Sequence, residues 1–260
     1  MNPLRNLLFP LLLAAWALSA SAQDGIVIMH GKGGMPQGLV RPLAEGLQAQ
    51  GWQVANLQMP WSRDRQYDVD VATAVKEVDA AISALRDKGA KRVFVAGHSQ
   101  GGVFAVHYAT LQPVDGLIAI APGGDVAHFV FLQQLGGAVR SARRMVSDGL
   151  GNERGEFLEY EGAKGSWTVR TTAAIYLSWF DPDGAMNLTR SLRAVRPATP
   201  VLMIVPTHDI PALRKIKDSN FRALPANPRS RLYEPDADHT GAPRASVDEI
   251  LRWAQETGKP

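Results

Sequence analysis

The chain contains no cysteine. This absence excludes disulfide bonds, thiolate metal sites and a lipid-modified N-terminal cysteine. An excess of charge of one sign is also missing, because 28 lysines and arginines against 25 aspartates and glutamates leave a net charge of +3. The chain has no basic block of the kind that binds nucleic acid, so we expect no nucleic-acid partner.

Motifs for metals and phosphorylated cofactors are missing as well. The sequence has no His-x-x-x-His metal pattern and no Gly-x-x-x-x-Gly-Lys-Ser/Thr phosphate loop. Glycines in residues 97–102 lack the Gly-x-Gly-x-x-Gly spacing of a dinucleotide site. We therefore expect neither a metal nor a cofactor.

The N-terminus has the pattern of a signal peptide over residues 1–22. It combines a short positive start, an apolar stretch that Pro10 interrupts, and Ala20-Ser21-Ala22 as a small-x-small cleavage site before Gln23. The apolar stretch is too short for a comfortable bilayer span, although an uncleaved anchor is the alternative. We expect an exported mature protein, and a bacterial periplasm or the medium suits a chain without disulfides.

Strands and helices are expected to alternate along most of the mature chain. Apolar, β-branched runs predict strands over residues 25–30, 52–57, 93–96, 117–121, 200–206 and 231–233. Helical spacing between them predicts helices that include residues 39–47, 69–88, 103–111, 213–224 and 247–257. This alternation predicts an α/β fold with a mostly parallel sheet of about six strands, covered by helices on both faces.

The alternation stops in residues 125–184, where the sequence shows no clear buried strand. Apolar spacing predicts a helix near residues 129–135, a second helix around residues 140–144, a polar loop over 149–165 and an aromatic helix over 171–180. We expect this insertion to form a helical cap over the carboxyl edge of the sheet, within one domain of residues 23–260.

A glycine-serine motif, Gly97-His98-Ser99-Gln100-Gly101, connects the third expected strand directly to a helix. Such a turn strains its central residue, and a side chain at either glycine would collide with the crossing backbone. The strain exposes the hydroxyl of Ser99 above the positive end of the helix. The pattern therefore predicts Ser99 as a nucleophile, with an ordinary glycine-rich turn as the alternative.

A serine nucleophile needs a base and an acid that orients it. Imidazole, with an ordinary pKa of about 6.5, can take the hydroxyl proton, and we assign this role to His239. Asp209 is the expected acid, because it follows a late strand and can fix the imidazole tautomer. Asp125, after the fourth strand, is the alternative acid, and His208 is a weaker alternative base.

In this order the motifs resemble the α/β-hydrolase family, and its serine esterases and lipases in particular, across essentially the whole mature chain. His30-Gly31 closes the first strand, the serine motif follows the third, and the Ser-Asp-His order is the one that this family uses. The family often has two strands before the His-Gly strand. This chain has no room for them, which implies a shortened sheet.

The negative oxygen that forms during acyl transfer needs backbone N–H donors aimed at it. The N–H of Gln100, directly after the nucleophile, is one expected donor. The family resemblance implies a second donor in the loop after the first strand, at Lys32, with Gly31 as the fallback. The alternative is a plain flexible loop in which the Lys32 side chain faces water.

Together these features predict an exported serine hydrolase that cleaves carboxylic esters through an acyl-enzyme. A peptidase, amidase or thioesterase on the same fold, or a non-catalytic binding protein, is the alternative, because a fold does not fix a substrate. Met35 and Trp61, which follow strand ends, are expected to line an apolar pocket for a small-molecule or lipid-like ester. We expect no stable membrane span after signal cleavage, and the oligomeric state is left open.

Overall fold

The structure is a computed structural model that describes residues 23–162 and 164–258. The expected signal peptide and its cleavage motif lie outside the described residues. Within the described ranges, no helix combines the length and the apolar character that crossing a membrane requires.

Six parallel strands form the central sheet, which confirms the expected α/β fold with a shortened sheet. The strands are β1 (Asp24–Met29), β2 (Gln53–Leu57), β3 (Arg92–His98), β4 (Gly116–Ile120), β7 (Val201–Ile204) and β8 (Arg231–Tyr233). Their order across the sheet is β2-β1-β3-β4-β7-β8. The chain therefore leaves β1 in one direction for β2 and then builds the rest of the sheet on its other side. Loops at the carboxyl ends diverge at such a switch point, which is where α/β sheets bind ligands.

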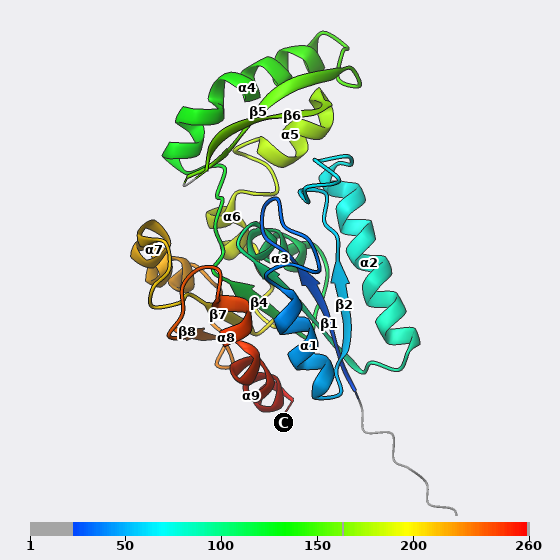
Figure 1. The fold of residues 1–260 in the computed structure, drawn as a ribbon, viewed down its shortest axis with the longest axis vertical. Coiled ribbons are helices and arrows are strands. Elements are labelled where there is room, and N and C mark those ends of the chain that lie inside the picture. Colours follow the sequence, from blue (N-terminus) through cyan, green and yellow to red (C-terminus); the bar gives the residue numbers. More distant parts are fainter. Residues whose placement is uncertain (1–22, 163, 259–260) are drawn as a thin grey trace, which may run out of the picture.

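Helices cover both faces of this sheet (Figure 1). They are α1 (Arg41–Ala49), α2 (Val71–Asp87), α3 (Gln100–Leu111), α6 (Leu188–Ala194), α7 (Pro211–Arg222), α8 (Ala242–Ala245) and α9 (Val247–Thr257). Successive strand residues point to opposite faces, so Ile26 packs in the core with α1 and α9, whereas Val27 packs in the core with α2, α3 and α6. Both faces are apolar, as a parallel sheet between two helical layers requires.

The inserted residues between β4 and α6 form a separate layer toward which the carboxyl end of β1 points (Figure 1). The layer consists of α4 (Phe129–Ser147), β5 (Arg154–Glu161), β6 (Gly165–Thr172) and α5 (Ala173–Phe180). The expectation of an insertion without a clear strand is wrong, because β5 lies within the segment predicted to be a polar loop and pairs with β6 as an antiparallel hairpin. Two expected helices are also the single helix α4.

Aromatic rings attach the inserted layer to the loop between β2 and α2. The ring centroids of Trp61 and Trp179 lie 5.5 Å apart, and those of Tyr67 and Phe180 lie 5.1 Å apart. The indole N–H of Trp179 also donates to the carbonyl oxygen of Val69 at 2.8 Å. The layer therefore rests on residues 58–69, which we call the β2–α2 loop.

Candidate active site

Ser99 occupies a strained turn between β3 and α3. Its backbone has φ of +54° and ψ of −119°, in a region that side-chain-bearing residues rarely adopt. An ideal Cβ at Gly97 would lie 2.0 Å from the carbonyl oxygen of Gly101, and one at Gly101 would lie 2.5 Å from that of Met29. Only glycine fits at these two positions. The glycine pattern and the strain have the same cause, because the backbones of β3, the turn and the end of β1 pack in direct contact.

The structure brings His239 and Asp209 together. His239 Nδ1 lies 2.6 Å from Asp209 Oδ1, and the Asp209 side chain is fully buried. The same oxygen accepts the backbone N–H of Ile210 at 2.7 Å, which fixes the carboxylate at the end of the loop after β7. A proton on Nδ1 leaves the Nε2 lone pair of His239 free to act as a base.

The alternative acid and base make contacts elsewhere. Asp125 accepts the N–H of Ala127 at 2.9 Å and the hydroxyl of Thr189 at 3.2 Å. His208 pairs with Asp236 at 2.9 Å, where both side chains are exposed. These contacts pair Asp125 with its own loop and with α6, and they pair His208 with the loop after β8.

His98, which precedes Ser99, supports the backbone of His239. Its Nε2 lies 2.8 Å from the carbonyl oxygen of His239, and its ring is 98% buried with the Nδ1 atom lacking a partner among the described residues. Burial, together with the nearby His239, lowers the pKa of His98 to about 4. The neutral ring therefore donates its Nε2–H to this carbonyl and holds the loop after β8 against β3.

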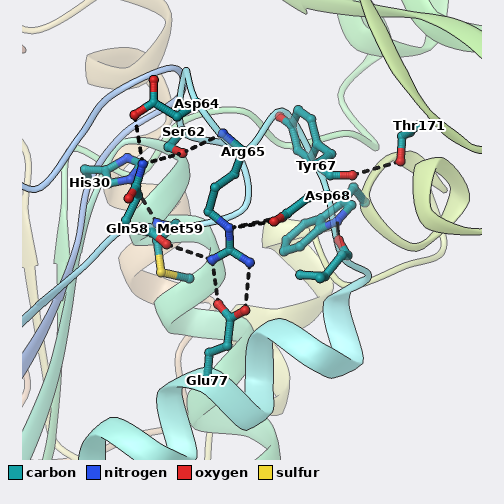
Figure 2. Close-up of polar contacts among 12 residues, drawn as sticks. His30, Gln58, Met59, Ser62, Asp64, Arg65, Tyr67, Asp68, Glu77 and Thr171 are labelled. Carbon is teal, nitrogen blue, oxygen red and sulfur yellow. Dashed lines mark hydrogen bonds and ion pairs between the residues drawn. The ribbon is translucent and has the colours of Figure 1, made fainter.

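The loop after β1 lies directly against Ser99. An ideal Cβ at Gly31 would be 3.2 Å from the Cβ of Ser99. Buried His30 fixes this loop, since its Nδ1 lies 2.7 Å from the carbonyl oxygen of Gly31. Its Nε2 accepts the N–H of Met59 at 3.0 Å (Figure 2). The distances fit a proton on Nδ1, and burial lowers the pKa of the ring.

Each of the two expected oxyanion donors follows one residue of the contact between Gly31 and Ser99. Lys32 follows Gly31, and Gln100 follows Ser99. Gln100 is the first residue of α3, so its backbone N–H has no acceptor within the helix. Neither side chain faces water: Gln100 is 4% exposed, and the Lys32 side chain is 9% exposed with its ammonium 2.7 Å from Glu159. The alternative of a solvated Lys32 side chain is therefore wrong.

Met35 and Trp61, the expected pocket residues, differ in burial. Trp61 is 2% exposed, and its indole N–H donates to the carbonyl oxygen of His30 at 2.8 Å. Met35 is half-buried in the loop before α1. A cavity of about 530 Å³ lies beside Asp125 and Arg190, and another of about 300 Å³ lies beside α4. Neither Met35 nor Trp61 lines these two cavities, and their place in an acyl pocket stays a prediction.

Sequence reasoning missed the buried side chains of Glu159 and Tyr67, which contact Lys32 and Gln100. Glu159 lies in β5, and its only sequence signal is its alternation with Phe157, which requires the hairpin to be recognised first.

Within the described ranges, no group of three or more histidines and carboxylates could hold a metal ion.

Comparisons with known proteins agree with this architecture. The sequence model of the alpha/beta hydrolase family matches residues 26–252. The crystal structure of a Paleococcus ferrophilus monoacylglycerol lipase is similar, with a TM-score of 0.60 and 20% identity over 91% of this chain and 97% of that one. No curated protein matches the sequence.

Two further solved structures share the fold at lower identity. A soluble variant of the monoglyceride lipase from Saccharomyces cerevisiae, in complex with a substrate analog, has a TM-score of 0.60 and 14% identity over 92% of this chain and 88% of that one. A structure from work on LipS and LipT, two metagenome-derived lipolytic enzymes, has a TM-score of 0.58 and 16% identity over 90% of this chain and 94% of that one.

Proposed function

Because this chain belongs to the alpha/beta hydrolase family, we propose that it is a serine hydrolase that cleaves carboxylic esters. The observation that carries the proposal is the strained Ser99 on the same edge of the sheet as the His239–Asp209 pair, whose nitrogen and oxygen lie 2.6 Å apart. An imidazole fixed in this way can take a hydroxyl proton during attack on a carbonyl.

The proposed reaction has two halves. Ser99 Oγ attacks the ester carbonyl carbon while His239 Nε2 takes the hydroxyl proton, and the Asp209 carboxylate stabilises the resulting imidazolium. The N–H groups of Gln100 and Lys32 hold the negative oxygen of the tetrahedral intermediate. Its collapse breaks the bond to the alcohol, which leaves with the proton from His239. Water then gives a proton to His239, attacks the acyl-enzyme and releases the carboxylic acid and Ser99.

Esters are favoured over amides by leaving-group chemistry. An alkoxide is a better leaving group than an amine anion, so an ester makes a smaller demand on the same residues. The lipase names of the similar structures agree with a lipid-like or small-molecule ester. A peptidase, amidase or thioesterase would use the same residues, and a binding protein would need none of them.

Labelling with a fluorophosphonate tests the nucleophile. We expect wild-type protein to be labelled once, at Ser99, and to hydrolyse p-nitrophenyl esters in a panel of acyl lengths. Ser99→Ala should abolish both. Wild-type protein that stays unlabelled and inactive on every ester would contradict the proposal.

A matched pair of variants tests the acid. Asp209→Asn should reduce kcat by about 10⁴-fold, because the amide favours the wrong tautomer of His239. Asp125 is a carboxylate in the loop that follows the neighbouring strand β4. Asp125→Asn should change kcat by less than about twofold. A mild and equal effect of the two substitutions would remove Asp209 from the mechanism.

We also propose that the protein is exported with a signal peptide over residues 1–22. The positive start, the apolar stretch and the small residues before Gln23 support this proposal. N-terminal sequencing of protein recovered from the periplasm or medium of a bacterial host should read from Gln23. Protein that stays in the cytoplasm with Met1 intact would refute it.

A further inference from the structure

The Lys32 ammonium is buried in the inserted layer. It donates to Glu159 Oε1 at 2.7 Å and to the carbonyl oxygen of Tyr160 at 2.8 Å, both in β5. It also lies 5.3 Å from the ring centroid of Phe131 and 5.9 Å from that of Trp167. Glu159 is 0% exposed, and Lys32 is its ion-pair partner. The charge of Lys32 is therefore neutralised inside the protein by a residue 127 positions away.

A tyrosine links Glu159 to Gln100. The hydroxyl of Tyr67 donates a short hydrogen bond to Glu159 Oε2 and accepts one from Gln100 Nε2 at 3.1 Å. Burial, followed by the charge of Glu159, raises the pKa of Tyr67 well above its ordinary value. The phenol therefore stays neutral and keeps the proton that it donates. Lys32, Glu159, Tyr67 and Gln100 form one continuous chain of contacts, which we call the buried polar chain.

Strained backbone dihedrals and contacts with β6 and α2 fix the part of the β2–α2 loop that carries Tyr67. Its backbone has φ of +57° and follows Gln66 at φ of +46°, so two consecutive residues are strained. Thr171 of β6 donates its hydroxyl to the Tyr67 carbonyl oxygen at 2.8 Å (Figure 2). Arg65 makes two bonds of 2.7 Å to Glu77 of α2 (Figure 2). These contacts place the phenol between β5 and the first turn of α3.

We propose that the buried polar chain is a positioning network through which β5 of the inserted layer holds both oxyanion donors, with Glu159 as its central residue. The proposal rests on the function proposed above, because Lys32 and Gln100 are donors only if Ser99 acts on a carbonyl. Lys32 and Gln100 each supply a donor N–H from the backbone and a side chain to the buried polar chain. We therefore expect that displacement of either side chain also shifts the backbone N–H of the same residue.

The energetics favour a fixed arrangement. A buried carboxylate is stable only when its lone pairs are satisfied, and Glu159 receives bonds from Lys32, Tyr67 and the N–H of Tyr160. A glutamine in its place has one acceptor oxygen for three donors, so its amide protons would face Lys32 or Tyr67. Oxyanion donors act only within about 2.7–3.1 Å of the negative oxygen, and small displacements reduce the rate strongly.

The test compares Glu159→Gln and Tyr67→Phe with Glu156→Gln as the matched control. Glu156 lies in the same strand, but its side chain is 63% exposed and pairs with exposed Arg170 at 2.8 Å. For Glu159→Gln we expect kcat to fall roughly tenfold to a hundredfold, with KM within about threefold, since a misplaced donor acts on the transition state. Tyr67→Phe should reduce kcat by up to about tenfold, and Glu156→Gln should equal wild type.

Fluorophosphonate labelling separates positioning from folding. The rate constant of labelling should fall with kcat in both variants, while the final label per molecule stays near one, because folded protein with misplaced donors still reacts slowly. Should Glu159→Gln fail to fold, Tyr67→Phe, which keeps the ring, decides. Variants that lose final label but keep wild-type rate constants would overturn the network and show a purely structural role. Wild-type protein without labelling or ester turnover would overturn the proposed function and this inference together.

Discussion

At the scale of single residues, Gly97 has the least room for a side chain among the described glycines. An ideal Cβ at Gly97 would lie 2.0 Å from the carbonyl oxygen and 2.1 Å from the carbonyl carbon of Gly101, which are backbone atoms without a rotamer to move. We expect Gly97→Ala to lower the free energy of unfolding by at least about 3 kcal/mol or to prevent folding. Urea denaturation of the variant measures the loss.

A second glycine provides the control for this prediction. Gly137 lies inside α4, has no positive φ, and an ideal Cβ there would meet nothing within 4 Å. Gly137→Ala should therefore leave stability unchanged or raise it by about 0.5–1 kcal/mol, through the higher helix propensity of alanine. Equal midpoints for the two variants would show that the turn can relax.

Candidate site residues were predictable where local chemistry marks them. Ser99 lies in a short glycine-serine motif between a strand and a helix, and Asp209 and His239 follow strand-like segments at one sheet edge. Glu159 was not predictable, because its role depends on contacts with Lys32 and Tyr67, which lie 127 and 92 positions away. No local sequence pattern indicates that this glutamate is buried rather than exposed on the surface.

At the scale of elements, the six sheet strands were predictable and the β5–β6 hairpin was not. The central strands β1, β3 and β4 contain long apolar runs because both of their faces are buried. In β5 the inward side chains include Phe157 but also the charged Glu159, while the outward ones are exposed. The charge at an inward position hides the period of two that would have marked a strand.

The β2–α2 loop is an element that depends on one arginine. Arg65 makes two bonds of 2.7 Å to Glu77, two of 3.0 and 3.1 Å to Asp68 and one of 2.8 Å to the carbonyl oxygen of Gln58. Lysine has one ammonium and cannot make this forked set of bonds. We expect Arg65→Lys to lower the free energy of unfolding by about 1–3 kcal/mol and to speed proteolytic cleavage within residues 62–68.

The same loop offers a matched substitution. Arg63 is exposed, and its side chain makes no hydrogen bond or ion pair with the described residues. Arg63→Lys should leave both stability and cleavage rate as in wild type, since it alters no contact. If both lysine variants resist the protease equally, the aromatic contacts of Trp61 and Tyr67 hold the loop without Arg65.

At the scale of the whole molecule, two buried histidines and one partly buried histidine couple stability to pH. Burial lowers the pKa of His98 and of His107 to about 4 and also lowers that of His30. In the unfolded chain each has a pKa of about 6.5, so between these values the unfolded state binds more protons. Stability is therefore complete above about pH 6.5 and is lost as the pH falls toward 4.

This window belongs to histidines rather than to carboxylates. The hydrogen bond from Thr73 lowers the pKa of Asp70 below its ordinary value. The stability that this carboxylate contributes is therefore lost only at more acidic pH. Each fully buried histidine contributes up to one proton, or about 1.4 kcal/mol per pH unit, to the slope of unfolding free energy against pH. Urea denaturation at pH 5, 6 and 7 should show stability rising with pH.

Replacement of His107 tests how the slope is distributed. His107 lies on α3, away from Ser99 in sequence, and is partly buried. His107→Gln should reduce the slope between pH 5 and 6 by up to one proton, because glutamine does not titrate, while its unfolding free energy above pH 7.5 should be as flat with pH as that of wild type. An unchanged acid slope would mean that His107 takes up its proton without unfolding and that His30 and His98 alone carry the dependence.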